Sequence, residues 1–114
     1  MKLVTAIFKP SRLDAVLDAL SDVGATGLTV SEVRGYGRQQ GKTEVYRGAE
    51  YEVRLLPKVK VEVACTPDAV ERVSEAITNA ANTGTIGDGK IFVLDLASVM
   101  RIRTGERDEQ AVGI

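Results

Sequence analysis

The chain has 114 residues, which is enough for one domain with a modest hydrophobic core. Hydrophobic residues make up 44% and charged residues 27%, so the composition excludes a disordered chain, and the net charge of −1 gives no field that would attract nucleic acid or an acidic membrane surface. The lack of histidine and the single cysteine exclude histidine-based catalysis, histidine metal sites and an internal disulfide.

The first half of the chain predicts a strand, a helix and a second strand. Residues 2–8 form an apolar strand pattern that starts directly after Met1, without a signal peptide. Ser11 is predicted to cap a helix whose apolar residues recur at helical spacing until the stop at Gly24. Residues 26–36 predict the second strand, which runs into a glycine-containing stretch.

Residues 38–56 show neither helical nor strand periodicity, and most of them are polar or charged. A long irregular insertion is uncommon in a small domain and is usually functional. We expect an exposed loop over about residues 38–56, with a two-stranded ribbon as the alternative.

The second half repeats the strand and helix pattern. Residues after Pro57 alternate in polarity up to Cys65, which we expect to be a buried, inert thiol. Thr66, Pro67 and Asp68 predict the start of a second helix, and a glycine loop and a strand over residues 90–96 follow it. This order predicts an α+β, ferredoxin-like βαββαβ fold in a single domain over residues 1–114, with a C-terminal segment over residues 97–114.

The predicted strands carry more apolar side chains than two short helices can cover. The open face of the sheet is therefore expected to pack against other subunits. The apolar residues concerned are Leu28, Val30, Val61, Val63, Phe92 and Leu94. Because no apolar stretch is long enough to span a membrane, we expect a cytoplasmic protein without membrane insertion. The net charge of −1 predicts no direct nucleic-acid binding.

Residues 84–90 (GTIGDGK) have the glycine spacing and the lysine of a phosphate-binding loop. Ile91 stands where a P-loop NTPase needs a hydroxyl for Mg²⁺, and the segment follows a helix and precedes a strand, which is the reverse of the P-loop order. The segment predicts nucleotide phosphate binding without a P-loop fold or efficient hydrolysis. A plain glycine turn is the alternative for this segment.

Four strings in the chain resemble the PII nitrogen-regulatory signal proteins. They are residues 46–51 (YRGAEY), 56–60 (LPKVK), 83–93 (TGTIGDGKIFV) and 101–106 (RIRTGE), and they cover nearly the whole chain in family order. The resemblance implies ferredoxin-like subunits that form homotrimers and bind ATP or ADP and 2-oxoglutarate in clefts between subunits. It also implies control of ammonium transporters, nitrogen-assimilation enzymes or regulators through the exposed loop.

The resemblance places ligand contacts on Gly37, Arg38, Gln39, Gly41, Lys58, Gly87, Asp88, Gly89, Lys90, Arg101 and Arg103. The residues of the glycine loop fall on the phosphate-binding loop of the family, and the three arginines fall on its other phosphate contacts. Forked guanidinium donors and converging backbone N–H groups match a triphosphate. Gln39 falls on the residue that contacts both Mg²⁺ and 2-oxoglutarate, and Lys58 falls on the residue that pairs with the 2-oxoglutarate carboxylate.

Tyr51 falls on the loop position that is uridylylated or adenylylated in many bacterial members, which implies a nucleotidylyltransferase as a partner. An ordinary interface anchor is the alternative for this tyrosine. Ala49 leaves no serine for the phosphorylation of some other members. The chain departs from the common family residues at Gln40, Lys42, Arg54 and Thr85. Arg54 reverses a charge at the base of the loop, and its effect is expected mainly on loop conformation and partner choice.

The sequence thus predicts a non-catalytic sensor of nucleotide and 2-oxoglutarate. One alternative is a diverged PII-like sensor of another small metabolite, which Gln39 and Lys58 together disfavour. The other is a small nucleotide hydrolase that uses Lys90 and Asp88, which the lack of an obvious water-activating group disfavours.

Overall fold

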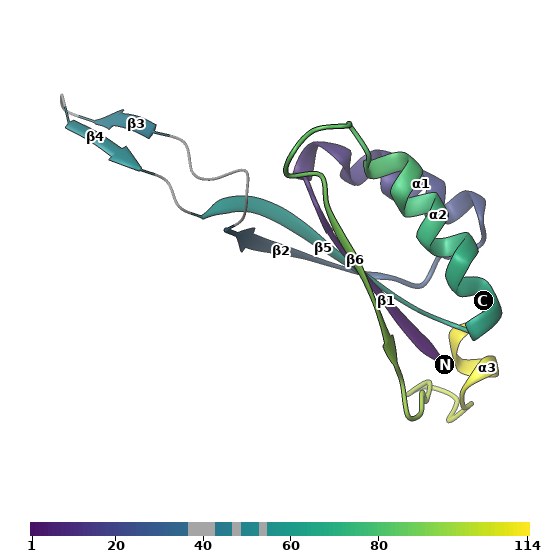
Figure 1. The fold of residues 1–114 in the computed structure, drawn as a ribbon. Helices are drawn as coiled ribbons and strands as arrows, with labels where there is room; N and C mark the ends of the chain where they lie inside the picture. Colours follow the sequence, from purple (N-terminus) through teal and green to yellow (C-terminus); the bar gives the residue numbers. More distant parts are fainter. Residues whose placement is uncertain (37–42, 47–48, 53–54) are drawn as a thin grey trace.

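The computed structural model describes residues 1–36, 43–46, 49–52 and 55–114. Its main sheet has the strand order β2-β5-β1-β6, and all neighbours are antiparallel. Helices α1 and α2 lie together on one face of this sheet (Figure 1). The bounds are β1 (Lys2–Phe8), α1 (Leu13–Asp22), β2 (Thr29–Gly35), β5 (Leu56–Cys65), α2 (Val70–Ala81) and β6 (Gly89–Asp95). The predicted ferredoxin-like α+β fold is therefore confirmed.

Helices α1 and α2 each follow a short 3₁₀ turn that opens with a proline. The turns are η1 (Pro10–Arg12) and η2 (Pro67–Ala69). The capping side-chain bonds expected near Ser11 and Thr66 are not formed, so this detail of the prediction was wrong. The 3₁₀ turns are closed by the main chain instead, because the Ala69 N–H donates to the Thr66 carbonyl at 3.1 Å. Proline suits the first position of such a turn, since its missing N–H would have no partner there.

The core lies between the helices and the sheet. Alternate residues of β5 are fully buried beneath α1 and α2, and Val61 and Val63 are 0% exposed. Cys65 ends this row, and burial raises the pKa of its thiol, which agrees with the inert role expected for it. Burial of such aliphatic side chains contributes about 1.5 to 3 kcal/mol each.

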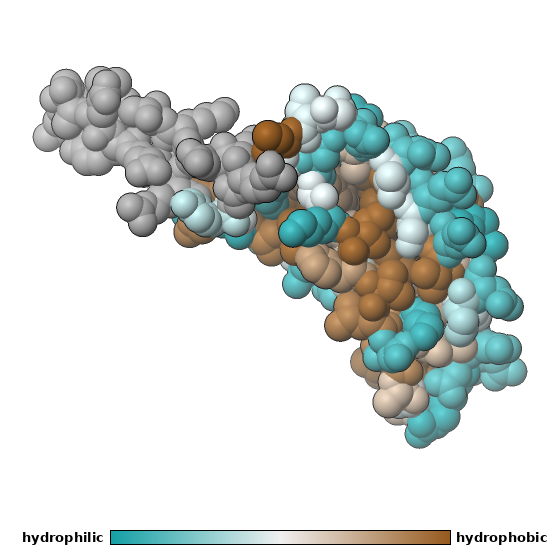
Figure 2. Space-filling model, viewed as in Figure 1, coloured by the Kyte–Doolittle hydropathy of each residue, from teal (hydrophilic) through white to brown (hydrophobic). Residues whose placement is uncertain are grey.

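The opposite face of the sheet carries apolar side chains that remain partly exposed. Phe92 is 46% and Leu94 is 48% exposed, and they lie opposite Thr5 and Leu3 of the central strand. Figure 2 shows apolar side chains gathered over β6. The apolar set predicted from the sequence is thus divided between the helix-covered core and an open face.

Residues 43–46 and 49–52 form β3 (Thr43–Tyr46) and β4 (Ala49–Glu52), which pair as an antiparallel ribbon. In Figure 1 this ribbon lies beyond the ends of β2 and β5, away from the helices. The predicted long segment between β2 and β5 therefore protrudes from the domain (Figure 1), and its described residues form the two-stranded ribbon of the alternative. The loop predicted over residues 38–56 also overlaps the main sheet, because β5 begins at Leu56.

Candidate functional site

The predicted phosphate loop connects the end of α2 to the start of β6. Its three glycines Gly84, Gly87 and Gly89 have φ angles of 77°, 97° and 107°, which side chains of L residues rarely allow. The side-chain oxygen of Asn82, at the end of α2, accepts a hydrogen bond from the Gly84 N–H at 2.8 Å. The turn itself therefore requires these glycines, before any ligand is considered.

Gly89 also lies directly against the central strand. A Cβ atom on Gly89 would lie 1.8 Å from the carbonyl oxygen of Ile7 and 2.9 Å from the Cα atom of Phe8. β6 begins its pairing with β1 at this point, where Gly89 lies opposite Phe8. Glycine at this position thus has a packing role in addition to the phosphate role predicted from the sequence.

The Asp88 carboxylate lies inside the loop and accepts hydrogen bonds from the loop's own main chain. The Thr83 N–H donates to Asp88 Oδ2 at 2.8 Å, and the Gly84 N–H donates to the same oxygen at 2.9 Å. The Thr83 hydroxyl donates to Oδ1. The Thr83 hydroxyl and backbone N–H, together with Lys9 and Gly84, hold the pKa of Asp88 well below its usual range.

Lys9 closes the loop from the side of β1. Its ammonium group lies 3.2 Å from Asp88 Oδ1 and donates to the Thr85 hydroxyl at 2.5 Å and to the Thr83 hydroxyl at 3.3 Å. The side chains of both Lys9 and Asp88 are about four-fifths buried, with 22% and 21% exposed. A partly buried ion pair with these additional hydrogen bonds fixes the loop to the end of β1.

Lys58 and Lys90 lie together on a cavity of about 450 Å³ next to the loop. The Lys58 ammonium donates to the Gly87 carbonyl at 2.7 Å, and Tyr36 and Phe92 also line the cavity. Burial lowers the pKa of Lys58 and the nearby charge of Lys9 lowers it further, while Asp88 opposes this shift. The structure therefore brings together the predicted residues Lys58, Gly87, Gly89 and Lys90.

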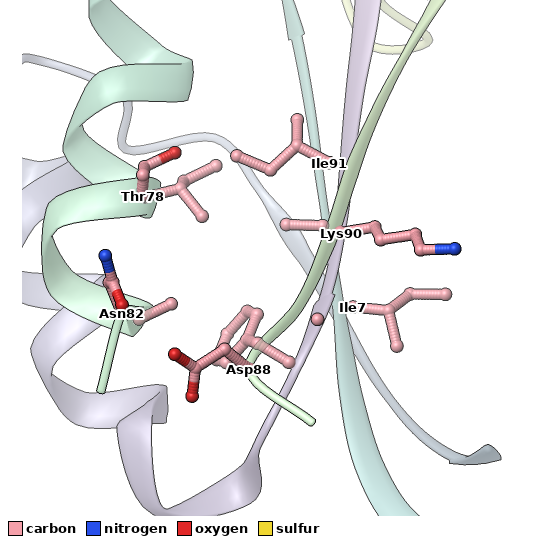
Figure 3. A pocket seen from close by; sticks show the side chains of 11 residues that line it. Ile7, Thr78, Asn82, Asp88, Lys90 and Ile91 are labelled. Carbon is pink, nitrogen blue, oxygen red and sulfur yellow. The ribbon is translucent and has the colours of Figure 1, made fainter. Parts of the chain in front are cut away.

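Asp88 and Lys90 point to opposite sides of the sheet (Figure 3). The Lys90 side chain extends away from α2, whereas the Asp88 carboxylate turns toward α2 and lines a second cavity of about 310 Å³ beside Thr78 and Asn82. The positive φ of Gly89 between them interrupts the strand alternation that would have placed both on one face. Asp88 does not line the cavity that holds Lys58.

The predicted pair Arg101 and Arg103 lies at the other end of β6, after the strand has crossed the sheet (Figure 1). A strand of this length spans roughly 20 Å. Arg101 is already engaged within its own segment, where its guanidinium donates to the Glu106 carboxylate at 2.9 Å and to the Ala111 carbonyl at 3.3 Å. Arg103 is exposed. One chain therefore does not bring these arginines to the phosphate loop.

Four of the predicted ligand residues, Gly37, Arg38, Gln39 and Gly41, lie outside the described residues. They follow Tyr36 directly in the chain, and Tyr36 lines the cavity of Lys58 and Lys90. Tyr51 lies in β4, where the structure describes the backbone. The departures at Gln40, Lys42 and Arg54 also lie outside the described residues, whereas Thr85 is the hydroxyl that Lys9 contacts.

Lys9, Thr83 and Glu106 are structurally important residues that the sequence analysis did not select. Lys9 reaches the loop because β1 and β6 are neighbours, and this pairing register places Phe8 opposite Gly89. Glu106 reaches Arg101 because the segment folds back, with the Arg101 N–H bonded to the Glu106 carbonyl at 2.9 Å. No local pattern in the sequence predicts the contact of Lys9 with the loop or the contact of Glu106 with Arg101.

Across the part of the chain that the structure describes, no group of three or more acidic, cysteine or histidine side chains could hold a metal ion. No helix among the described residues is long and apolar enough to cross a membrane. An arrangement of two lysines beside a glycine loop is suited to binding anions.

The chain is similar over nearly its full length to a set of known proteins. The family model described as Nitrogen regulatory protein P-II matches residues 1–106. The Nitrogen regulatory protein P-II of Pasteurella multocida (strain Pm70) is 60% identical over 112 residues, covering 98% of this chain and 100% of that protein. The Nitrogen regulatory protein GlnK of Escherichia coli (strain K12) is 58% identical over 112 residues, with the same coverage.

A solved structure also resembles the fold. The crystal structure of Arabidopsis thaliana PII bound to citrate has a TM-score of 0.79 and 41% sequence identity, and the match covers 97% of this chain and 88% of that chain. The likeness therefore extends from the sequence to the arrangement of the sheet and helices.

Proposed function

The chain belongs to the nitrogen regulatory P-II family of signal proteins, and on this premise we propose that it senses ATP or ADP together with 2-oxoglutarate. In this proposal the ligands select conformations of the loop over residues 38–56, which target proteins distinguish. A ligand shifts such an equilibrium by its difference in affinity for the two conformations. The protein acts as a regulator and catalyses no reaction of its own.

The observation that carries this proposal is the cavity of about 450 Å³ lined by Lys58, Gly87 and Lys90. Two cationic side chains and a glycine turn face one space, which suits phosphate and carboxylate groups in close proximity. Tyr36 lines the same cavity and directly precedes the segment that contains the predicted ligand residues Arg38 and Gln39. Each charge-assisted hydrogen bond to a ligand contributes about 1.5 to 3 kcal/mol.

The proposal includes a magnesium ion that would take most of its ligands from the nucleotide. Mg²⁺ is commonly held by one or two protein oxygens together with phosphates and water. The described residues offer no carboxylate cluster, and the Asp88 carboxylate already accepts bonds within its loop. The Gln39 amide oxygen would supply the protein ligand to this ion, and the ion would neutralise charge on the bound anions.

We further propose that the assembly is a homotrimer in which each site combines two chains. Arg101 and Arg103 lie at the far end of β6 from Lys90, and Phe92 and Leu94 remain about half exposed on the open sheet face. Contact between such faces would bury the apolar side chains and bring the arginines of one chain to the loop of its neighbour. The citrate bound to the Arabidopsis protein is an anionic ligand in a structure of the same family.

The regulatory output of this proposal is contact with a target in the cytoplasm, of the type of an ammonium transporter or a nitrogen-assimilation enzyme. Tyr51 lies in the two-stranded ribbon, where a nucleotidylyltransferase could reach a protruding segment. Attachment of a nucleotide there would add negative charge and bulk, which changes the surface that a target meets.

The experiment that tests the function is calorimetric titration of 2-oxoglutarate into protein loaded with ADP and into protein loaded with ATP and Mg²⁺. Appreciable binding is expected in the ATP and Mg²⁺ state, and ADP should not support it. Because linkage is reciprocal, 2-oxoglutarate should also tighten ATP, with a coupling of about 1 to 3 kcal/mol. Lys58→Ala should abolish this effect while ATP still binds.

Equal 2-oxoglutarate affinities in the two states, or no binding in either, would contradict the proposed coupling of 2-oxoglutarate binding to ATP and Mg²⁺. Such a result would favour a family member that senses another small metabolite. A phosphate-release assay run on the same samples should show slow turnover, and a rate of about 1 per second or faster would favour the hydrolase alternative.

A further inference from the structure

The geometry of the phosphate loop gives Asp88 a different role from the ligand contact predicted from the sequence. We propose that the Asp88 side chain is a positioning group: together with Lys9 it occupies the main-chain anion site at Thr83 and Gly84, and thereby fixes Gly87, Gly89 and Lys90 for phosphate without its carboxylate touching the nucleotide. This inference rests on the proposed nucleotide site.

The first support is that the Asp88 carboxylate is already filled with donors. It accepts from the Thr83 N–H at 2.8 Å, the Gly84 N–H at 2.9 Å and the Thr83 hydroxyl, and Lys9 lies 3.2 Å away. A carboxylate offers about four acceptor positions, so these four donors leave little capacity for a metal or a ligand hydroxyl. The Thr85 N–H approaches the same carboxylate at 3.4 Å.

The second support is direction. The Asp88 carboxylate turns toward α2, whereas the Lys90 side chain extends from the other side of the sheet, where Lys58 lines the cavity (Figure 3). A phosphate held by the Lys90 ammonium group would therefore lie across the strand from the Asp88 carboxylate. The Asp88 carboxylate and the Lys90 ammonium group thus lie on opposite sides of β6, although parts of both residues line the cavity beside Thr78 and Asn82.

The third support is the chemistry of the loop itself. Successive backbone N–H groups in a tight turn form a concave site that attracts anions. At Thr83 and Gly84 this site holds the protein's own carboxylate, so a phosphate is excluded there by occupancy and by like charge. The ligand is directed instead to the part of the loop that faces Lys58 and Lys90.

Lys9 makes this arrangement rigid. It contacts Asp88 and the hydroxyls of Thr83 and Thr85, and it follows Phe8, whose strand carries the pairing with Gly89. The loop is therefore connected to the central strand through an ion pair and through main-chain pairing. A loop fixed before the ligand arrives loses less conformational entropy on binding.

The first test uses the protein without nucleotide and measures amide hydrogen exchange in Asp88→Asn, which keeps the shape of the side chain and removes its charge. Exchange at the Thr83 and Gly84 N–H groups should become at least tenfold faster. The matched control is Asp95→Asn, because Asp95 pairs with Lys2 at the other end of β6 and should leave the loop unchanged. Unchanged exchange in Asp88→Asn would overturn the proposal whether or not the protein binds ATP.

The second test compares ATP, ADP and adenosine on the same variants by calorimetry. Asp88→Asn should weaken ATP at least fivefold more than adenosine, because the loop is ordered for phosphates. The loss should be the same with and without Mg²⁺. An equal loss for ATP and adenosine, or a loss confined to the titrations with Mg²⁺, would overturn the positioning role.

Thr83 provides a pair of variants in case Asp88→Asn fails to fold. Thr83→Ser keeps the hydroxyl that donates to Asp88, and Thr83→Val removes it at similar volume. Thr83→Val should reproduce the faster exchange and the ATP-selective loss, and Thr83→Ser should retain wild-type behaviour. Identical behaviour of the two variants would contradict the hydroxyl-to-carboxylate contact. If wild-type protein binds no ATP, the proposed function fails, and the exchange result still decides the role of Asp88.

Discussion

The two segments that flank β6 differ in what they contribute to one predicted site. The loop before the strand is tied to β1 through Lys9 and Asp88 and reaches the cavity of Lys58 and Lys90. The segment after the strand also forms internal bonds, with Arg101 held by Glu106 at 2.9 Å, but it lies at the far end of the sheet.

This difference teaches that internal order and completeness of a site are separate properties. Each segment is ordered by hydrogen bonds and an ion pair, yet each carries only part of the phosphate contacts predicted from the sequence. Gly87, Gly89 and Lys90 precede the strand, and Arg101 and Arg103 follow it. The roughly 20 Å length of β6 keeps these two sets apart within a chain, so a second copy must supply the missing set in our proposal. The following predictions test this contrast, starting from the largest expected effect.

Gly89→Ala should destabilise the protein by about 3 kcal/mol or more, because the backbone is strained at positive φ and the new Cβ atom would lie only 1.8 Å from the Ile7 carbonyl oxygen. Gly105→Ala in the other segment is the matched control, since its φ is also positive, 74°, and a Cβ there would have no neighbour within 4 Å. Its cost should be about 1 kcal/mol. Urea unfolding of both variants measures the difference, and equal costs would show that β1 tolerates the added methyl.

Lys90→Ala and Arg103→Ala should each weaken ATP binding at least tenfold, which corresponds to about 1.4 kcal/mol. The effects should be similar although the two side chains lie at opposite ends of β6. Calorimetry measures the affinity, and light scattering checks that each variant keeps the oligomeric state of the wild type. If both variants bind ATP as tightly as the wild type, the phosphate site lies elsewhere.

Glu106→Gln should tighten ATP binding by roughly twofold to fivefold, because Arg101 would no longer have to give up its ion pair with the Glu106 carboxylate to bind a phosphate. The effect is small since the two side chains are 40% and 39% exposed and water screens their attraction. Glu109→Gln in α3 (Glu109–Val112) is the control for the loss of a nearby negative charge. Weaker ATP binding in Glu106→Gln would mean that the pair holds Arg101 in its binding position.

The affinity for 2-oxoglutarate should decrease at alkaline pH, starting below the ordinary lysine value of 10.5. Burial and Lys9 lower the pKa of Lys58, so its proton is lost at a lower pH than in an exposed lysine. The 2-oxoglutarate carboxylate is attracted only by the protonated Lys58 ammonium group. Binding of 2-oxoglutarate is therefore retained at lower pH and is lost as the pH rises through the pKa of Lys58. Titrations between pH 7 and 10 measure the effect, and a constant affinity would place the keto acid away from Lys58.

The fold could be predicted from the sequence because the spacing of apolar residues indicates which side chains are buried. The alternation that ends at Cys65 placed Val61 and Val63 on one face of a strand, and both are fully buried. The glycine spacing likewise located a turn that needs positive φ angles at Gly87 and Gly89. These features depend on local backbone geometry, which nearby residues determine.

The parts that did not follow from the sequence depend on contacts between distant elements. The register of β1 on β6 brings Lys9 to Asp88 across 79 positions of the chain, and no local pattern encodes that distance. The capping roles expected at Ser11 and Thr66 were replaced by main-chain bonds in the 3₁₀ turns. The separation of Arg101 from Lys90 could be seen only in the folded sheet, where β6 runs between the two segments.

The measurement that tests the central claim most directly is ATP binding to mixed assemblies of Lys90→Ala and Arg103→Ala chains, formed by refolding the two variants together. If each site takes its loop from one chain and its arginines from the next, every mixed trimer regains one intact site. An equal mixture should then show wild-type affinity at about a quarter of all sites. Separately refolded variants, combined afterwards without subunit exchange, are the control. If co-refolded mixtures regain no high-affinity sites, both halves act within one chain and the shared-site account is wrong.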